Sequence, residues 1–150
     1  MTIVALVLVG VFLERTLYFK ELAEKAAMEQ VALDIRSSVN LKVAELVLVN
    51  RFFELDALAN QNPMDLLAKK PPNYLGIRTN PDSSTIADGG WYYDNSLKEV
   101  VYCVVSGRYF RPDAQGRKCA AWRVRVVGGS APGLAPQWAR FEAARPYAWF

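Results

Sequence analysis

The sequence of 150 residues contains no histidine and only two cysteines. Histidine is the commonest general base and a frequent metal ligand, so its absence argues against many kinds of catalysis. The two cysteines, Cys103 and Cys119, form neither a CxxC redox motif nor a zinc-binding pattern. They are either one disulfide in an oxidising compartment or two buried thiols on neighbouring strands, and spacing alone does not decide between these alternatives.

Runs of charge of one sign are also missing. The chain has 18 Lys and Arg against 15 Asp and Glu, mixed along the sequence, so we expect no nucleic-acid partner. It has no P-loop and no EF-hand pattern. Five side chains that could offer oxygens to calcium do not have the EF-hand spacing, and we expect no metal, no cofactor and no enzymatic activity. These five are Asn80, Asp82, Asp88, Asp94 and Asn95.

Charged residues are absent from Thr2 to Leu13, which read TIVALVLVGVFL. A helix that is apolar on every face needs lipid or protein on all sides. We therefore expect residues 1–19 to form a membrane or filament-core segment, with Tyr18 and Phe19 at the level of an interfacial aromatic belt. Twelve helical residues reach about 18 Å, whereas the hydrocarbon core of a bilayer is about 30 Å thick. The residues assigned to this assembly segment are Ile3, Val4, Leu6, Val7, Leu8, Val9, Gly10, Val11, Phe12, Leu13, Glu14 and Arg15.

Three of these residues have two possible roles. Gly10 either permits close approach of neighbouring helices or is an ordinary glycine of a membrane helix. Glu14 and Arg15 either pair with neighbouring subunits or lie at the level of the lipid headgroups.

Proline and glycine are missing from Leu13 to Gln61, where Leu, Ala, Glu and Lys are frequent. We expect residues 20–62 to form an amphipathic stalk helix, with Glu21 and Lys25 as a favourable i,i+4 pair. Together with the apolar tip, this predicts one helix of roughly 55–60 residues, about 85 Å long. Asn62 is expected to cap a short helix that begins at Pro63. The apolar stripe of the stalk contains Met28, Val31, Ile35, Val39, Val43, Leu46, Val49 and Phe53.

Residues 63–150 have the pattern of a β-rich globular part. Lys69 to Pro72 is typical of a linker, and residues 76–89 of a polar loop. Residues 90–94 and 98–105 predict a hairpin, and alternation in residues 118–127 predicts a third strand. The tail from Gly128 gives no clear signal. The expected fold class is α+β, in which the long helix covers a small antiparallel sheet.

The order of these segments resembles the type IV pilin and type II secretion pseudopilin family. The resemblance covers about residues 1–105: the apolar run ends in Glu14-Arg15, continues into LYFKELAEKAAMEQVALDIRSSVNLKVAELV, and is followed by NPMDLL, PPNYLG and GGWYYDNSLKEVVYCV. These motifs are most similar to minor pilins and pseudopilins of Gram-negative bacteria. The pilin leader, its peptidase site and an early glutamate do not precede Thr2, so we expect the sequence to start inside the mature helix.

The resemblance implies a structural, non-enzymatic subunit of a bacterial pilus or secretion pseudopilus. Such a subunit stands in the inner membrane with its C-terminal part in the periplasm, or in an extracellular pilus. Its partners are other pilin or pseudopilin subunits and the inner-membrane assembly platform.

A membrane-tethered periplasmic binding or sensor module is the competing hypothesis. It shares the anchor, the stalk and the small sheet. In such a module Trp91, Tyr92, Tyr93, Tyr109 and Trp122 would line a pocket, whereas in a simple hairpin they alternate between core and surface.

Overall fold

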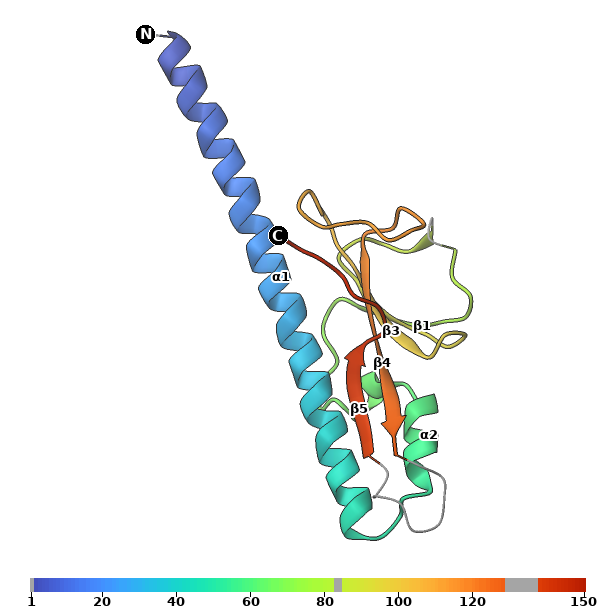
Figure 1. Cartoon of the computed structure of the whole chain (residues 1–150). Helices are drawn as coiled ribbons and strands as arrows, with labels where there is room; N and C mark the ends of the chain where they lie inside the picture. The colour runs from blue at the N-terminus through green and yellow to red at the C-terminus, as the bar shows by residue number, and fades with distance from the viewer. Residues whose placement is uncertain (1, 83–84, 129–137) are drawn as a thin grey trace.

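The computed structural model describes residues 2–82, 85–128 and 138–150, and its architecture is a long helix packed along a five-stranded sheet (Figure 1). Helix α1 (Thr2–Leu48) is one continuous element of 47 residues. Its C-terminal half lies against the sheet, and its N-terminal end extends far beyond the rest of the molecule. The expected α+β class, with a long N-terminal helix on a small sheet, is confirmed.

Helix α1 ends at Leu48, so the prediction of one stalk helix over residues 20–62 is wrong. Asn50 adopts a left-handed backbone with φ of 57°. The N–H of Arg51 donates to the Leu46 carbonyl at 2.9 Å, and the N–H of Asn50 donates to the Val47 carbonyl at 3.1 Å. This is the Schellman pattern that closes helices, with asparagine in the position usually taken by glycine.

The chain after this turn forms two short helices that cover one end of the sheet. Helix α2 (Glu54–Asn60) buries Leu55 and Leu58. The 3₁₀ helix η1 (Pro63–Leu66) begins where a short helix is expected, because the Asn62 side chain accepts a hydrogen bond from the N–H of Met64 at 3.1 Å.

The sheet has the strand order β1-β2-β3-β4-β5. The predicted hairpin is present as β2 and β3, and the third predicted strand is present as β4. The expectation of a purely antiparallel sheet is wrong, because β1 pairs parallel to β2. Two consecutive parallel strands need a connection that brings the chain back to the end of the sheet at which the first strand began. The segment between Arg78 and Trp91 is this connection. The strands are β1 (Tyr74–Arg78), β2 (Trp91–Asp94), β3 (Glu99–Cys103), β4 (Cys119–Val127) and β5 (Trp138–Ala143).

Strand β5 is formed by the tail, which shows no clear pattern in the sequence. It pairs antiparallel with β4 over the whole of its length and packs against α1. Its Phe141 is 2% exposed and its Ala139 is fully buried. The tail therefore completes the surface on which the helix rests.

The main core lies between α1 and the sheet. Most of the predicted stripe is buried there: Met28, Ile35, Val39, Val43 and Leu46 are each at most 2% exposed. The last two residues of the predicted stripe lie outside the core because the helix has already ended. Val49 is 56% exposed and Phe53 is 74% exposed.

Alternate residues of the strands face the helix. Trp91 and Tyr93 pack into the core with α1, whereas Tyr92 belongs to a second buried cluster on the opposite face of the sheet, together with Val101 and Cys103. This is the period of two that a pleated strand imposes. Both faces of the hairpin are thus apolar and covered.

Candidate assembly helix and its junction with the domain

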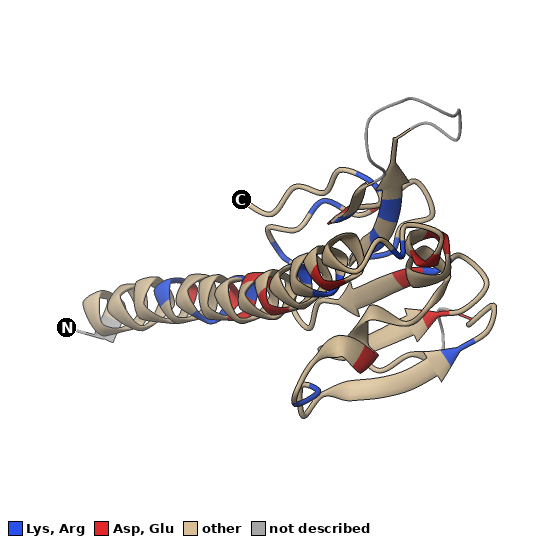
Figure 2. Ribbon diagram, turned by 90° about the horizontal axis from the view of Figure 1, so that it is seen from below, with Lys and Arg blue, Asp and Glu red and all other residues tan. Residues whose placement is uncertain are grey.

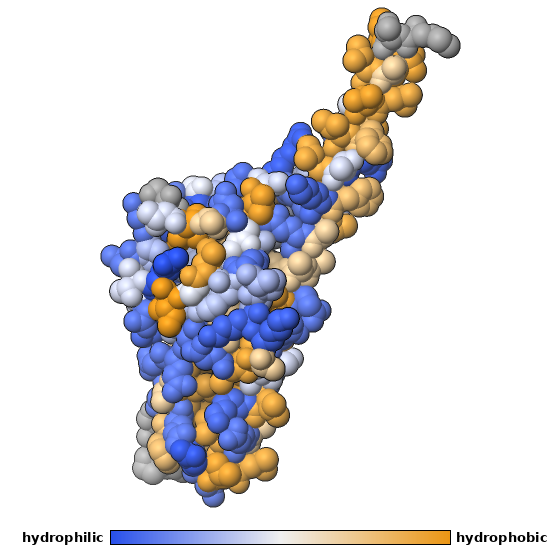
Figure 3. All heavy atoms as spheres, turned by 180° about the vertical axis from the view of Figure 1, so that it is seen from behind, coloured by the Kyte–Doolittle hydropathy of each residue, from blue (hydrophilic) through white to orange (hydrophobic). Residues whose placement is uncertain are grey.

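The N-terminal part of α1, residues 3–15, projects beyond the rest of the domain, and we call this mainly apolar segment the rod (Figure 1). Every large apolar residue from Ile3 to Leu13 is between 53% and 76% exposed. Gly10, Glu14 and Arg15 are exposed as well. Figure 3 shows the projecting end almost wholly in the hydrophobic colour. In the ribbon of Figure 2, the colours of charged residues begin on α1 only after its first turns. All twelve residues assigned to the assembly segment therefore lie on this rod.

Among the described residues, no helix combines the length and the apolar character that crossing a membrane requires.

Helix α1 has a second uncharged face along the domain, which we call the outer ridge. Its positions recur at steps of three and four residues and so lie above one another on the side away from the buried stripe. Leu33, Leu41 and Leu48 on this ridge are 50%, 74% and 85% exposed. No charged residue belongs to the ridge, although charged residues flank it on the helix. The outer ridge consists of Phe19, Ala23, Ala26, Gln30, Leu33, Ser37, Leu41, Ala44 and Leu48.

A buried glutamate ties the base of the rod to the domain. Glu21 is 2% exposed. Its carboxylate accepts hydrogen bonds from the backbone N–H of Arg108 at 2.7 Å, from that of Tyr109 at 3.2 Å and from the indole N–H of Trp149 at 3.1 Å. Hydrogen bonds to an ionised acceptor are stronger than neutral ones. The carboxylate therefore fixes both the β3–β4 connection and the C-terminal segment against the helix.

The predicted pair between Glu21 and Lys25 is wrong, because both side chains have other partners. The ammonium group of Lys25 donates to the carbonyl of Trp149 at 3.2 Å and lies 5.6 Å from the ring centre of Phe150. It also lies 3.9 Å from the carboxylate of Glu29. The pair of Glu21 with Lys25 was predicted from helical spacing, which carries no information on which side chains the domain covers.

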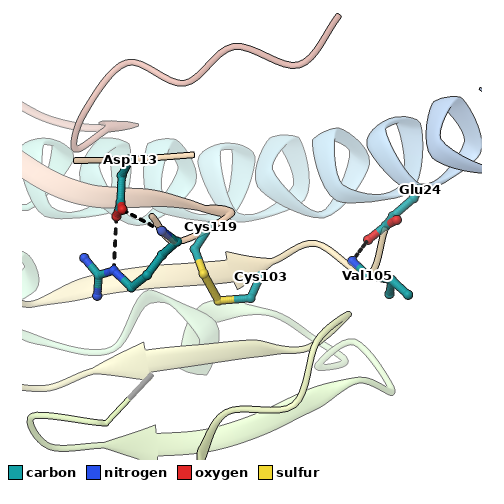
Figure 4. The surroundings of a disulfide bond; sticks show 6 residues. Glu24, Cys103, Val105, Asp113 and Cys119 are labelled. Carbon is teal, nitrogen blue, oxygen red and sulfur yellow. Dashed lines mark hydrogen bonds and ion pairs between the residues drawn. A yellow bond between two sulfur atoms is a disulfide. The ribbon is translucent and has the colours of Figure 1, made fainter. Parts of the chain in front are cut away.

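One turn further along, Glu24 makes a second polar contact between α1 and the domain. It accepts from the hydroxyl of Tyr102 at 2.9 Å. It also accepts from the N–H of Val105 at 2.7 Å, the contact drawn in Figure 4. Burial of the phenol, reinforced by the hydrogen bond to this carboxylate, raises the pKa of Tyr102 well above its ordinary value. Tyr102 therefore stays a hydrogen-bond donor throughout the neutral range.

Aromatic rings fill the angle between the rod and the domain. The ring of Tyr18 lies 5.8 Å from Tyr109 and 5.2 Å from Phe150, and these last two rings stack at 5.3 Å. Nearby, the guanidinium of Arg108 lies 3.9 Å from the carboxylate of Glu14. Both members of that pair are more than half exposed, so the pair adds little to stability.

Cys103 and Cys119 form a disulfide, which selects one of the two alternatives left open by their spacing. The two residues are directly opposite each other on β3 and β4, with 4.1 Å between their Cα atoms. Figure 4 shows the bridge at the start of the connection between these strands. It closes the segment that carries Arg108 and Tyr109.

Asp113 organises the turn within that segment. Its carboxylate accepts from the N–H groups of Gln115 and Arg117 at 3.0 Å and 2.8 Å, and from the Arg117 guanidinium at 3.1 Å. Burial opposes ionisation of this carboxyl, but the hydrogen bonds and the charge of Arg117 outweigh it and lower the pKa of Asp113 below its ordinary value.

The chain matches no protein-family model, no curated protein and no solved structure.

The aromatic residues considered for a pocket do not gather around one cavity. Trp91, Tyr93 and Trp122 are at most 3% exposed and belong to the core beneath the helix. Tyr92 lies on the opposite face, where it borders a cavity of about 310 Å³ beside the disulfide. Tyr109 lies at the junction described above.

The oxygen-bearing residues considered for calcium do not form a site in the described part of the chain. No group of three metal-ligating side chains occurs within residues 2–82, 85–128 and 138–150. Asp94 instead caps the β2–β3 turn, where its carboxylate accepts from the N–H groups of Ser96 and Leu97.

Proposed function

We propose that this protein is a structural subunit of a bacterial type IV pilus or type II secretion pseudopilus, of the minor pilin or pseudopilin kind. It assembles through its N-terminal helix and is not an enzyme. Before assembly it is held in the inner membrane with its C-terminal part in the periplasm. Other subunits of the filament and the inner-membrane assembly platform are its partners.

The observation that carries this proposal is the exposed apolar rod. Nine large apolar side chains between Ile3 and Leu13 are more than half exposed on all sides of the helix. Full burial of one such side chain stabilises a structure by roughly 1.5–3 kcal/mol. A lipid bilayer would bury these side chains in a single subunit. When subunits leave the membrane, the rods of neighbouring subunits would bury them.

The outer ridge extends the same argument along the domain. A helix that packs one apolar face on its own sheet normally carries charge on the other face. Here the other face is uncharged from Phe19 to Leu48, and three of its leucines are at least half exposed. Small and apolar residues in this pattern allow helices to approach closely. The ridge is therefore suited to contact with helices of neighbouring subunits.

The disulfide, together with the resemblance of the segment order to pilins and pseudopilins, supports a periplasmic location of the domain. Disulfides persist in oxidising compartments such as the bacterial periplasm and the cell surface. The Cys103–Cys119 bridge joins adjacent strands of the domain, away from the rod.

Cross-linking through single cysteines tests the proposal. Both native cysteines are bridged, so Val7→Cys places the single free thiol of the chain on the rod. In membranes of cells that make the full-length gene product, a short maleimide–benzophenone reagent is attached to this thiol and then activated by light. It should yield ladders of more than two subunits, because the probe of one subunit inserts into a neighbour that carries a probe of its own. Leu97→Cys is the matched control, because it is 54% exposed on the β2–β3 turn, away from the rod.

The competing module gives a different result in the same experiment. A tethered binding or sensor protein would stop at monomers or dimers through Val7→Cys. That outcome would overturn the filament proposal and favour the tethered module.

A further inference from the structure

The net charge of the chain is concentrated in one segment. The β3–β4 connection, residues 105–118, has four basic residues, Arg108, Arg111, Arg117 and Lys118, and one acidic residue, Asp113, a balance of three positive charges. The whole chain also has a formal net charge of +3. Basic and acidic residues elsewhere in the chain therefore balance, and this connection accounts for the excess.

The same segment lies at the end of the domain that faces the rod (Figure 1). Strand β3 runs toward that end, since Val105, which follows it, contacts Glu24 of α1. The backbone N–H of Arg111 donates to the carbonyl of Ala148 at 2.9 Å, so the C-terminal segment lies beside it. The excess charge is thus located where the apolar part of the helix meets the domain.

Partly exposed aromatic rings accompany this charge. Tyr18, Tyr109 and Phe150 are 36%, 39% and 48% exposed, although they contact one another. A shallow groove of about 250 Å³ between Val11, Glu14, Arg15, Tyr18 and Tyr109 separates the rod from the domain. Tyrosines that have an apolar body and a polar hydroxyl are enriched at the boundary between hydrocarbon and water.

Acidic groups around this junction do not cancel the charge toward solvent. Glu21 is buried and accepts three hydrogen bonds, and Glu24 is held by Tyr102 and Val105. The carboxylate of Glu14 lies 3.9 Å from the guanidinium of Arg108, and this exposed pair is weak. Both Arg108 and Arg111 are exposed.

We propose that this end of the domain, formed by Tyr18, Arg108, Tyr109, Arg111 and Phe150 and called here the collar, binds the headgroups of anionic phospholipids. The inference rests on the proposed function in one respect, namely that the rod lies in lipid before assembly. Once the rod enters the bilayer, the collar is the first part of the domain to meet the headgroups. Basic residues near an anionic membrane surface are attracted to it, and aromatic rings favour the same depth.

The experiment uses the full chain reconstituted into vesicles. An environment-sensitive fluorophore on Ala114→Cys reports from an exposed position in the same segment. Vesicles of phosphatidylcholine alone are compared with vesicles that contain about one third phosphatidylglycerol, and a spin-labelled headgroup serves as quencher. We expect quenching only in the anionic vesicles. It should fall to the neutral level at about 1 M salt, where the Debye length is roughly 3 Å.

Two charge-matched double variants locate the effect. We call the domain docked when its collar is in contact with the headgroups. R108Q/R111Q should lower the ratio of docked to undocked domain roughly thirtyfold, because each basic residue near an anionic surface contributes a similar free energy of attraction. R78Q/R140Q should leave the ratio unchanged, because both residues lie toward the opposite end of the sheet, Arg78 opposite Asp94 and Arg140 opposite Arg125. R108Q/R111Q keeps the backbone hydrogen bonds from Arg108 to Glu21 and from Arg111 to Ala148, and an unchanged unfolding midpoint verifies its fold.

The outcomes separate this inference from the filament proposal. Equal quenching in neutral and anionic vesicles, or equal losses in the two double variants, would overturn the collar. Cross-linked ladders from Val7→Cys together with either of these results would leave the filament proposal standing. Docking that depends on lipid charge and on Arg108 and Arg111, with no ladders, would support the collar and overturn the filament.

Discussion

At the scale of single residues, Glu21 determines how the rod is joined to the domain. It is a carboxylate at 2% exposure whose partners are two backbone N–H groups and one indole N–H. Its neighbour one turn on, Glu24, holds the end of β3 in a similar way. The direction in which the apolar rod leaves the domain therefore depends on polar contacts in addition to the core.

Substitution of Glu21 by glutamine tests this role. The amide keeps the shape but replaces one acceptor oxygen with a donor that faces another donor. We expect the free energy of unfolding to fall by about 2–4 kcal/mol, measured by urea denaturation of the full chain in detergent. Glu29→Gln is the matched control on the same helix, because Glu29 is half exposed in its ion pair with Lys25. It should change stability by less than about 0.5 kcal/mol. Equal effects of the two substitutions would contradict the role of Glu21.

At the scale of elements, the disulfide sets the boundaries of the β3–β4 connection. Cys103 and Cys119 face each other across two antiparallel strands, with a sequence separation of 16. The bridge closes the segment that brings Arg108 and Tyr109 to helix α1. Its main effect is to limit the conformations of this segment in the unfolded chain.

Reduction of the bridge should lower the free energy of unfolding by about 3 kcal/mol, the value for a closed loop of this length. Urea midpoints with and without a reductant measure the difference. The C103A/C119A variant should unfold like the reduced protein and should not respond to the reductant. A reductant effect that persists in this variant would mean that the loss of stability has another cause.

At the scale of the whole molecule, helix α1 has two apolar faces and the domain covers only one of them. The sheet buries the stripe from Met28 to Leu46, while the outer ridge remains exposed. The rod continues this exposure on all sides (Figure 3). The exposed apolar side chains therefore follow the axis of one helix, and this is the surface that the proposed assembly would bury.

A charge on the outer ridge should interfere with assembly without affecting the fold. Leu41 is 74% exposed, so Leu41→Glu should change the free energy of unfolding by less than about 0.5 kcal/mol. In the Val7→Cys background it should strongly reduce the cross-linked ladders, because a carboxylate would be buried between helices without a partner. Leu97→Glu makes the same chemical change on the β2–β3 turn and should leave the ladders intact. If both variants gave full ladders, the outer ridge would not be a contact.

Much of the local structure could be predicted because its signals lie within a few residues. The absence of proline and glycine indicated the long helix, the spacing of Met28, Ile35, Val39 and Val43 indicated its buried face, and alternation indicated β2, β3 and β4. The end of the helix was misplaced because the Schellman turn at Asn50 uses a residue other than glycine. The exposure of the rod could be expected from its composition. A helix that is apolar on every face cannot be covered on all sides by one small domain.

Local patterns were enough to predict the long helix, strands β2, β3 and β4, the apolar rod and the α+β class, since each depends on neighbouring side chains and on the period of the backbone. Contacts between groups far apart in the sequence could be seen only in the folded chain. Glu21 reaches partners 87, 88 and 128 residues away, and no local pattern marks it as buried. The parallel pairing of β1, the fifth strand from the tail and the facing of Cys103 and Cys119 likewise depend on the path of the chain in space. That path is set by the cooperative burial of both faces of the sheet, to which residues between Met28 and Trp149 contribute.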